Sequence, residues 1–289
     1  MNLRAVSLDR LPGVGFVMIA SVLSLALAGC ESVGGFGSRG GVSPSTEISE
    51  DCAAIQTNVA SLTDVVQRNP NDSQAYNTRG AAYAKCGRYQ EAINDFSSAI
   101  KVDPQNAPAY TNRGLAYQRI GRNDQAQQDF TRAIEANPRH APAYLARANL
   151  LRSQNQLDQA MSDLNQAIRL NPEQAQAFHA RGLIYQRNGD HARAITDFDN
   201  AIDRDPFNAP PYQARGQSLT VVGKYDAAIE DFNAALNINN SNADAWAGLG
   251  LAYERKGDRT KAQESYARAL AVNPNNQFAR EGQSRVGRG

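Results

Sequence analysis

Prolines recur at intervals of 34 residues along most of this 289-residue chain. They stand at Pro70, Pro104, Pro138, Pro172 and Pro206, and again at Pro274, with Asn240 in the intervening position. A fixed period of this length is typical of arrays in which each repeat stacks on its neighbours because it cannot bury its apolar face alone. The sequence therefore predicts one continuous array, although its length alone would suggest two domains.

Further positions share this period when Ser73 is counted as position 1. Position 20 is always Ala, and position 8 is Gly in every repeat except the third, which has Ala148. Position 4 is always aromatic, and position 24 is Phe, Leu164 or Tyr266. Small residues let two antiparallel helices approach closely, and the large ones fill the space around that contact. A helix pair is predicted for each repeat, with Gly or Asn155 at position 15 ending the first helix in a left-handed conformation.

This pattern resembles the tetratricopeptide repeat family. The resemblance implies an all-α fold, an α-solenoid in which helix–turn–helix units form a right-handed superhelix. Six repeats are expected over 73–276, at 73–106, 107–140, 141–174, 175–208, 209–242 and 243–276. A degenerate capping helix is expected over 47–72 and a C-terminal cap or tail over 277–289, where Gly282 weakens the helix.

Position 7 departs from the family pattern, which places an aliphatic residue there. It is Arg in the first five repeats, and position 23 is Asp in the same five, whereas the sixth repeat has Leu249 and Ser265. Because acid and base disappear together, we predict an ion pair between the two helices of each repeat. The expected pairs are Arg79–Asp95, Arg113–Asp129, Arg147–Asp163, Arg181–Asp197 and Arg215–Asp231. The alternative is a basic ladder that binds acidic ligands.

The first 29 residues resemble a bacterial lipoprotein signal peptide. Arg4 and Arg10 precede an uncharged stretch over 11–28, and small residues then lead to Cys30. The resemblance implies cleavage before Cys30 and lipidation of that residue with diacylglycerol and an acyl chain such as palmitate. An ordinary secretory peptide and an uncleaved membrane anchor are the alternatives. Glu31 favours the periplasmic face of the outer membrane, with inner-membrane retention left open, and the Gly/Ser-rich residues 30–46 predict a flexible tether.

Two further cysteines, Cys52 and Cys86, would then lie in an oxidising compartment. Both fall at repeat position 14. Equivalent positions of stacked repeats should lie too far apart for a disulfide, unless the capping helix is longer and shifted. A bond between them and two separate small thiols both stay open.

The inner groove of the family is lined by first-helix positions 2, 5, 6, 9, 12 and 13. The predicted partner-binding residues there are amides and cations: Asn77, Lys85, Asn112, Gln118, Arg119, Asn149, Arg152, Gln186, Arg187, Gln213, Gln217 and Arg255. They suit an extended peptide of some acidic character, although a solvated polar face would carry the same residues. Position 5 is never Lys, so the family's carboxylate clamp for chaperone tails is not expected.

Composition and spacing argue against other classes of function. The 30 Lys and Arg balance 29 Asp and Glu, so no nucleic-acid surface is expected. His140, His179 and His191 lack metal-ligand spacing, and no Gly-rich phosphate loop follows a strand. We therefore expect no metal, no cofactor and no enzymatic activity.

These features predict a lipid-anchored periplasmic scaffold that recruits protein or peptide partners. The resemblance implies an adaptor for peptidoglycan hydrolases or proteases. A pilotin for pilus secretins and an accessory protein of outer-membrane assembly are alternatives, and an envelope enzyme or glycan-binding module is the alternative of another class. Association into a homo-oligomer through a weakly capped end also stays open.

Overall fold

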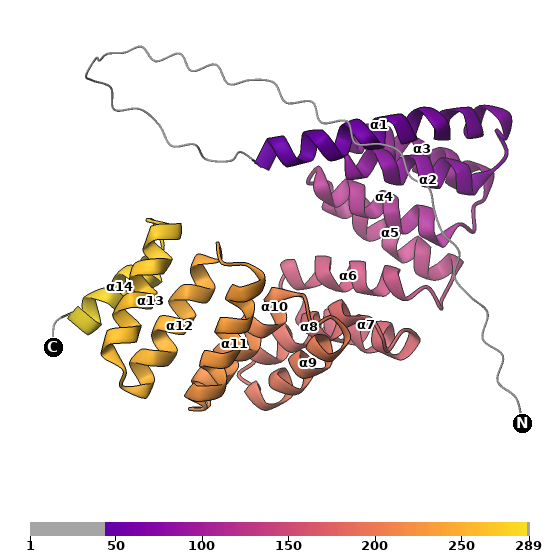
Figure 1. The fold of residues 1–289 in the computed structure, drawn as a ribbon. Coiled ribbons are helices and arrows are strands. Elements are labelled where there is room, and N and C mark those ends of the chain that lie inside the picture. The colour runs from indigo at the N-terminus through magenta and orange to yellow at the C-terminus, as the bar shows by residue number, and fades with distance from the viewer. Residues whose placement is uncertain (1–43, 288–289) are drawn as a thin grey trace, which may run out of the picture. The chain divides into compact units, whose positions relative to one another are not determined.

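A computed structural model describes residues 44–287, which form fourteen α-helices and no strand (Figure 1). The helices are α1 (Pro44–Arg68), α2 (Ser73–Lys85), α3 (Tyr89–Val102), α4 (Ala107–Arg119), α5 (Asn123–Ala136), α6 (Ala141–Ser153), α7 (Leu157–Leu170), α8 (Ala175–Arg187), α9 (His191–Arg204), α10 (Ala209–Val221), α11 (Tyr225–Ile238), α12 (Ala243–Lys256), α13 (Arg259–Val272) and α14 (Gln277–Gly287). Each expected repeat contains one helix pair, which confirms the predicted α-solenoid.

The ends of the helices follow from local chemistry. The turn inside each pair contains a residue with positive φ, which is Gly in five repeats and Asn155, at φ 62°, in the third. Asn tolerates this conformation better than other residues with a side chain. At the opposite end, the Asn106 side chain accepts a hydrogen bond from the Ala109 amide and so caps the start of α4.

Close helix approach explains the small residues at positions 8 and 20. A Cβ atom at Gly182 would lie 2.6 Å from the ring of Phe198, so a larger residue would force the helices α8 and α9 apart. Ala194 and Phe198 are fully buried in the same contact. The core is therefore a row of small units, each built around one aromatic or Leu side chain at position 24.

Stacking brings the first helices of successive repeats together. α2 contacts α4, α4 contacts α6, and the series continues to α12 and α14, whereas the second helices of successive repeats make no such contacts within the described residues. The first helices therefore line the more tightly packed face of the stack. We call this face, formed by α2, α4, α6, α8, α10 and α12, the groove.

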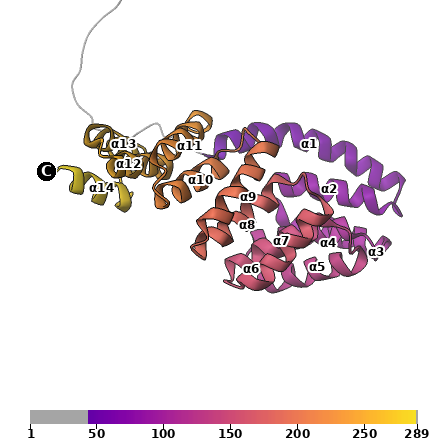
Figure 2. The same cartoon turned by 90° about the horizontal axis from the view of Figure 1, so that it is seen from below.

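The N-terminal end of the array differs from the expected boundary, whereas α14 lies within the cap expected over 277–289. α1 begins at Pro44, inside the segment expected to be tether, and ends at Arg68. α14 packs beside α12 and α13, as Figure 2 shows at the yellow end. Gly282, which has low helix propensity, is buried in this helix, and a Cβ there would collide with the Tyr266 ring. Its small size is what lets α14 close the array.

The expected signal peptide, Cys30 and most of the tether lie outside the described residues. Within 44–287, no helix is both long and apolar enough to span a membrane.

Candidate functional site

The arginines at position 7 are held inside the array. In all five, Nε and Nη2 donate to the two carboxylate oxygens of the expected aspartate, at 2.6–2.8 Å. The aspartate side chains are at most 8% exposed, so the fork-to-fork geometry compensates for lost hydration. These hydrogen bonds raise the pKa of each arginine above its usual range.

Each of these arginines also bonds to the preceding repeat, a contact that the sequence reasoning missed. The Nη1 atom donates to the side chain at position 25 of the preceding second helix, at 2.6–3.4 Å, and these acceptors are Thr63, Ser97, Thr131, Asn165 and Asp199. The sequence does contain a signal for this contact, because position 25 is polar in every repeat that precedes one of these five arginines. We call these five arginines with their acceptors the ladder. Because their donors are used within the array, the ladder does not suit an acidic ligand.

The last junction is built differently. Leu249 replaces the arginine and is buried, and the Ser265 hydroxyl donates to the Lys261 carbonyl oxygen instead. The Tyr266 hydroxyl donates to Glu254 at 2.6 Å, and Arg285 of α14 donates to both oxygens of the same carboxylate. An acid and a base thus join the cap to the sixth repeat.

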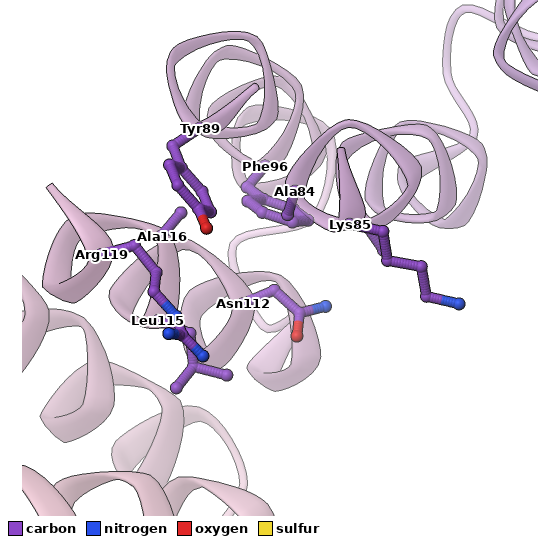
Figure 3. A pocket seen from close by; sticks show the side chains of 9 residues that line it. Ala84, Lys85, Tyr89, Phe96, Asn112, Leu115, Ala116 and Arg119 are labelled. Carbon is purple, nitrogen blue, oxygen red and sulfur yellow. The ribbon is translucent and has the colours of Figure 1, made fainter. Parts of the chain in front are cut away.

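One end of the groove holds a hollow between the first two repeats (Figure 3). It has a volume of about 480 Å³. Tyr89, Leu115 and Arg119 lie on one side and Lys85 on the other, with Asn112 between them (Figure 3). Lys85 and Arg119 are exposed and form no ion pair with a described side chain. The hollow can accept an apolar side chain with a polar or acidic neighbour.

A second hollow lies at the other end of the groove and is more apolar. It has a volume of about 360 Å³ and is formed by α10, α11, α12 and α14, with Gln213, Gln217, Val221, Leu251 and Phe278 in its wall. Val221 is 65% exposed at the repeat position where four of the other first helices carry a cation. The sequence reasoning named the two glutamines and missed the apolar residues, although Val221 is the one apolar residue at position 13 of the six repeats.

Between these hollows, Arg152, His179 and Arg187 lie on α6 and α8, two first helices that contact each other. The Nε atom of Arg152 is buried without a hydrogen-bond partner, and no described carboxylate forms an ion pair with Arg152. Burial lowers the pKa of His179 to about 4, and the charge of Arg152 contributes to that shift. Burial and the charge of Arg187 also lower the pKa of Arg152.

Some predicted groove residues are used within the array. Asn112 donates to Asn77, and Gln213 accepts from Asn242. Gln186 donates to the Ala214 carbonyl oxygen and to the Ser218 hydroxyl, so this side chain joins repeats four and five. The remaining predicted residues lie on first helices and make no side-chain hydrogen bond to described residues: Gln118, Asn149, Gln217 and Arg255.

Cys52 and Cys86 lie next to each other and are not joined by a disulfide. The Cys86 Sγ lies 4.0 Å from the Cys52 carbonyl oxygen. Within the described residues, no group of three or more His, Cys, Asp or Glu side chains is placed to hold a metal ion.

Comparisons with known proteins agree with this architecture. Profiles described as TPR repeat match residues 80–121, 148–189 and 222–257. Profiles described as tetratricopeptide repeat match residues 62–94, 107–140, 130–161, 175–208 and 243–276. A search of curated proteins finds no match.

Solved structures similar to this chain include the Cut9–Hcn1 hetero-tetramer of the APC/C, at 22% identity and a TM-score of 0.70 over 84% of this chain and 47% of that one. Pseudomonas aeruginosa pilF matches at 19% identity and a TM-score of 0.69, over 76% of this chain and 99% of its own. YrrB, a TPR protein with an unusual peptide-binding site, matches at 22% identity and a TM-score of 0.56, over 65% and 97%. At these identities the likeness is one of fold.

Proposed function

Because the chain belongs to the tetratricopeptide repeat family, we propose that it is a binding scaffold whose groove holds an extended segment of a protein partner. The observation that carries this proposal is the contrast between its arginines. Those of the ladder have their donors occupied, whereas Lys85, Arg119, Arg152, Arg187 and Arg255 form no ion pair with a described carboxylate. Cations left without a partner favour a ligand that carries acidic groups.

The groove also offers apolar contacts at both ends. Leu115 is 42% exposed beside the first hollow, and Val221 and Phe278 are exposed beside the second. Few residues usually supply most of the binding energy at an interface, and they fill pockets of this kind. A peptide segment with apolar side chains and acidic neighbours fits the groove along its length.

The envelope role completes the proposal. The signal-like residues 1–29 and Cys30 support a chain that is lipid-anchored on the periplasmic face of the outer membrane. There it acts as an adaptor that recruits a peptidoglycan hydrolase or a protease to the cell envelope. Several acyl chains on one cysteine anchor a protein stably, whereas one chain alone binds only marginally.

Site-specific photocrosslinking in growing cells tests the groove. A benzophenone amino acid replaces Leu115 in the first hollow or, as a control, Gln128, which is exposed on the second helix α5. We expect a discrete crosslinked partner from position 115 and none from position 128. Equal capture from both positions, or capture from 128 alone, contradicts binding in the groove.

Substitution Cys30→Ser tests the anchor separately. We expect the wild-type chain in the membrane fraction, labelled by an alkyne analogue of palmitate, and the variant unlabelled and outside that fraction. Wild-type chain that carries no label, or a variant that keeps it, contradicts lipidation of Cys30.

A further inference from the structure

We infer that Arg152, His179 and Arg187 form a carboxylate-binding site in the middle of the groove, where an acidic group of the bound peptide segment is held. This inference rests on the proposed function and names the point of charge recognition within it. Arg152 and Arg187 stand in the last turns of α6 and α8, and His179 stands near the start of α8.

The inference depends on the environment of the Arg152 side chain. The Nε–H of this guanidinium is buried and lacks an acceptor among the described residues. A cation near the end of a helix interacts well with the helix dipole, but that interaction does not require the guanidinium to be buried. A buried donor without an acceptor is costly, so native structures rarely keep one unless a ligand or water completes it.

In two other repeats, the residue at the same position, position 12, has a partner within the chain. Position 12 is Glu254 in the sixth repeat, and its carboxylate accepts from Arg285 and Tyr266. It is Gln186 in the fourth repeat, where the amide bonds across to Ala214 and Ser218. Among the charged residues at position 12 within 44–287, Arg152 is the one that no side chain of the array neutralises.

The surrounding charges select an anion. Arg187 adds a second positive charge, and burial together with this charge lowers the pKa of Arg152, so the two cations repel each other when the site holds no anion. A bound carboxylate relieves that repulsion and accepts the unused donors of Arg152. The ladder demonstrates the preferred geometry, because each of its guanidinium groups holds both oxygens of one carboxylate.

The third member of the site, His179, adds a hydrogen-bond donor without adding charge. The low pKa of His179 keeps its imidazole neutral at pH 7, so it contributes one N–H donor and no charge. His179 also contacts the Phe198 ring at a centroid distance of 5.8 Å, which holds the imidazole in place. The imidazole therefore offers a hydrogen bond to a bound carboxylate without adding to the positive charge of the two arginines.

Nuclear magnetic resonance of the histidine Cε1–H groups tests the site directly. The probes are a blocked pentapeptide Ac-Gly-Glu-Leu-Glu-Gly-NH2, the same peptide with Gln in place of Glu, a Gln version with a free C-terminal carboxylate, and inorganic phosphate. Signals are assigned with the variants His140→Gln, His179→Gln and His191→Gln. The two carboxylate peptides distinguish a side-chain source from a chain terminus.

We expect the Glu peptide to shift the His179 signal saturably and to raise the pKa of His179, because a negative charge then lies beside the ring. The neutral peptide leaves this signal in place. Arg152→Gln should weaken binding by at least about tenfold, through loss of a charge-assisted hydrogen bond. Arg132→Gln, which removes an exposed cation from the second helix α5, should change it less than about twofold, since exposed charges contribute little.

Several results would overturn the inference. These are an equal shift with the neutral peptide, unchanged binding by Arg152→Gln, or a response to phosphate without a response to either carboxylate peptide. Circular dichroism melts establish that each variant remains folded. If photocrosslinking from position 115 succeeds while these titrations fail, the groove function stands and the carboxylate site falls.

Discussion

Arginine has two contrasting environments in this molecule. In the ladder, each guanidinium lies between the helices of a repeat, holds one buried aspartate and reaches an acceptor in the preceding repeat. In the groove, Arg152 is half-buried and has no described acid beside it. The difference teaches that repeat position, and not residue type, decides whether a cation stabilises the array or remains available to a ligand.

The sixth repeat shows that the ladder is one of two solutions to the same packing problem. Leu249 and Ser265 occupy its two positions and are buried there. A buried ion pair and an apolar pair of similar shape often differ little in stability, whereas half an ion pair is costly. This contrast leads to three predictions.

The largest effect is expected from Arg181→Leu. It leaves the Asp197 carboxylate, 4% exposed, without its partner, and we expect the free energy of unfolding to fall by about 3–5 kcal/mol. The double variant Arg181→Leu/Asp197→Ser copies the sixth repeat and should recover most of that loss. Urea denaturation followed by circular dichroism measures both. A double variant no more stable than the single one would show that the ladder cannot be replaced.

A smaller effect is expected from His179 in acid. Its pKa is about 4 in the folded chain and near 6.5 when unfolded, so only the unfolded chain takes up this proton between those values. The contribution to stability is complete above pH 6.5, falls as the pH drops, and is lost by pH 4, at most about 3 kcal/mol in all. Urea denaturation from pH 7.5 to 4 should show a shallower decline for His179→Gln than for the wild type. Parallel curves would contradict the burial of this ring.

The smallest effect on stability is expected from Arg152→Gln. Because this arginine has no ion pair to lose, we expect the free energy of unfolding at pH 7 to change by less than about 1 kcal/mol. Burial is the main cause of the low pKa of His179, and the substitution removes the charge that adds to it, so the acid-dependent loss should shrink slightly. Arg181→Gln is the matched control, since the same substitution in the ladder should cost several times more. Equal losses from the two variants would erase the distinction between ladder and groove.

Much of the fold was predictable because the 34-residue period shows which positions of each helix pair pack against each other. Ala at position 20 and an aromatic or Leu residue at position 24 report helix contacts that are local in sequence. The joint loss of acid and base at Leu249 and Ser265 indicated the partners of the ladder. Its third contact was missed because Thr63 and Ser97, read alone, look like ordinary surface residues.

The rest depended on contacts between distant helices. The second hollow combines α10, α11, α12 and α14, and no local pattern reports that Val221 and Phe278 lie at one opening. Helix propensity does not report the packing at Gly282, where a Cβ atom would collide with the Tyr266 ring. Burial of Arg152 without an acceptor likewise follows from packing between repeats.

Partner capture from a crosslinker at Asn149, one turn before Arg152 on α6, tests most directly whether the unpaired cations recruit the ligand. It compares the wild type with Arg152→Gln/Arg187→Gln and with Arg132→Gln/Arg169→Gln, which removes the same charge from exposed positions of the second helices α5 and α7. We predict that capture falls about tenfold in the groove variant only, with melting temperatures unchanged. Equal capture by all three chains would contradict a ligand-binding role for the groove arginines.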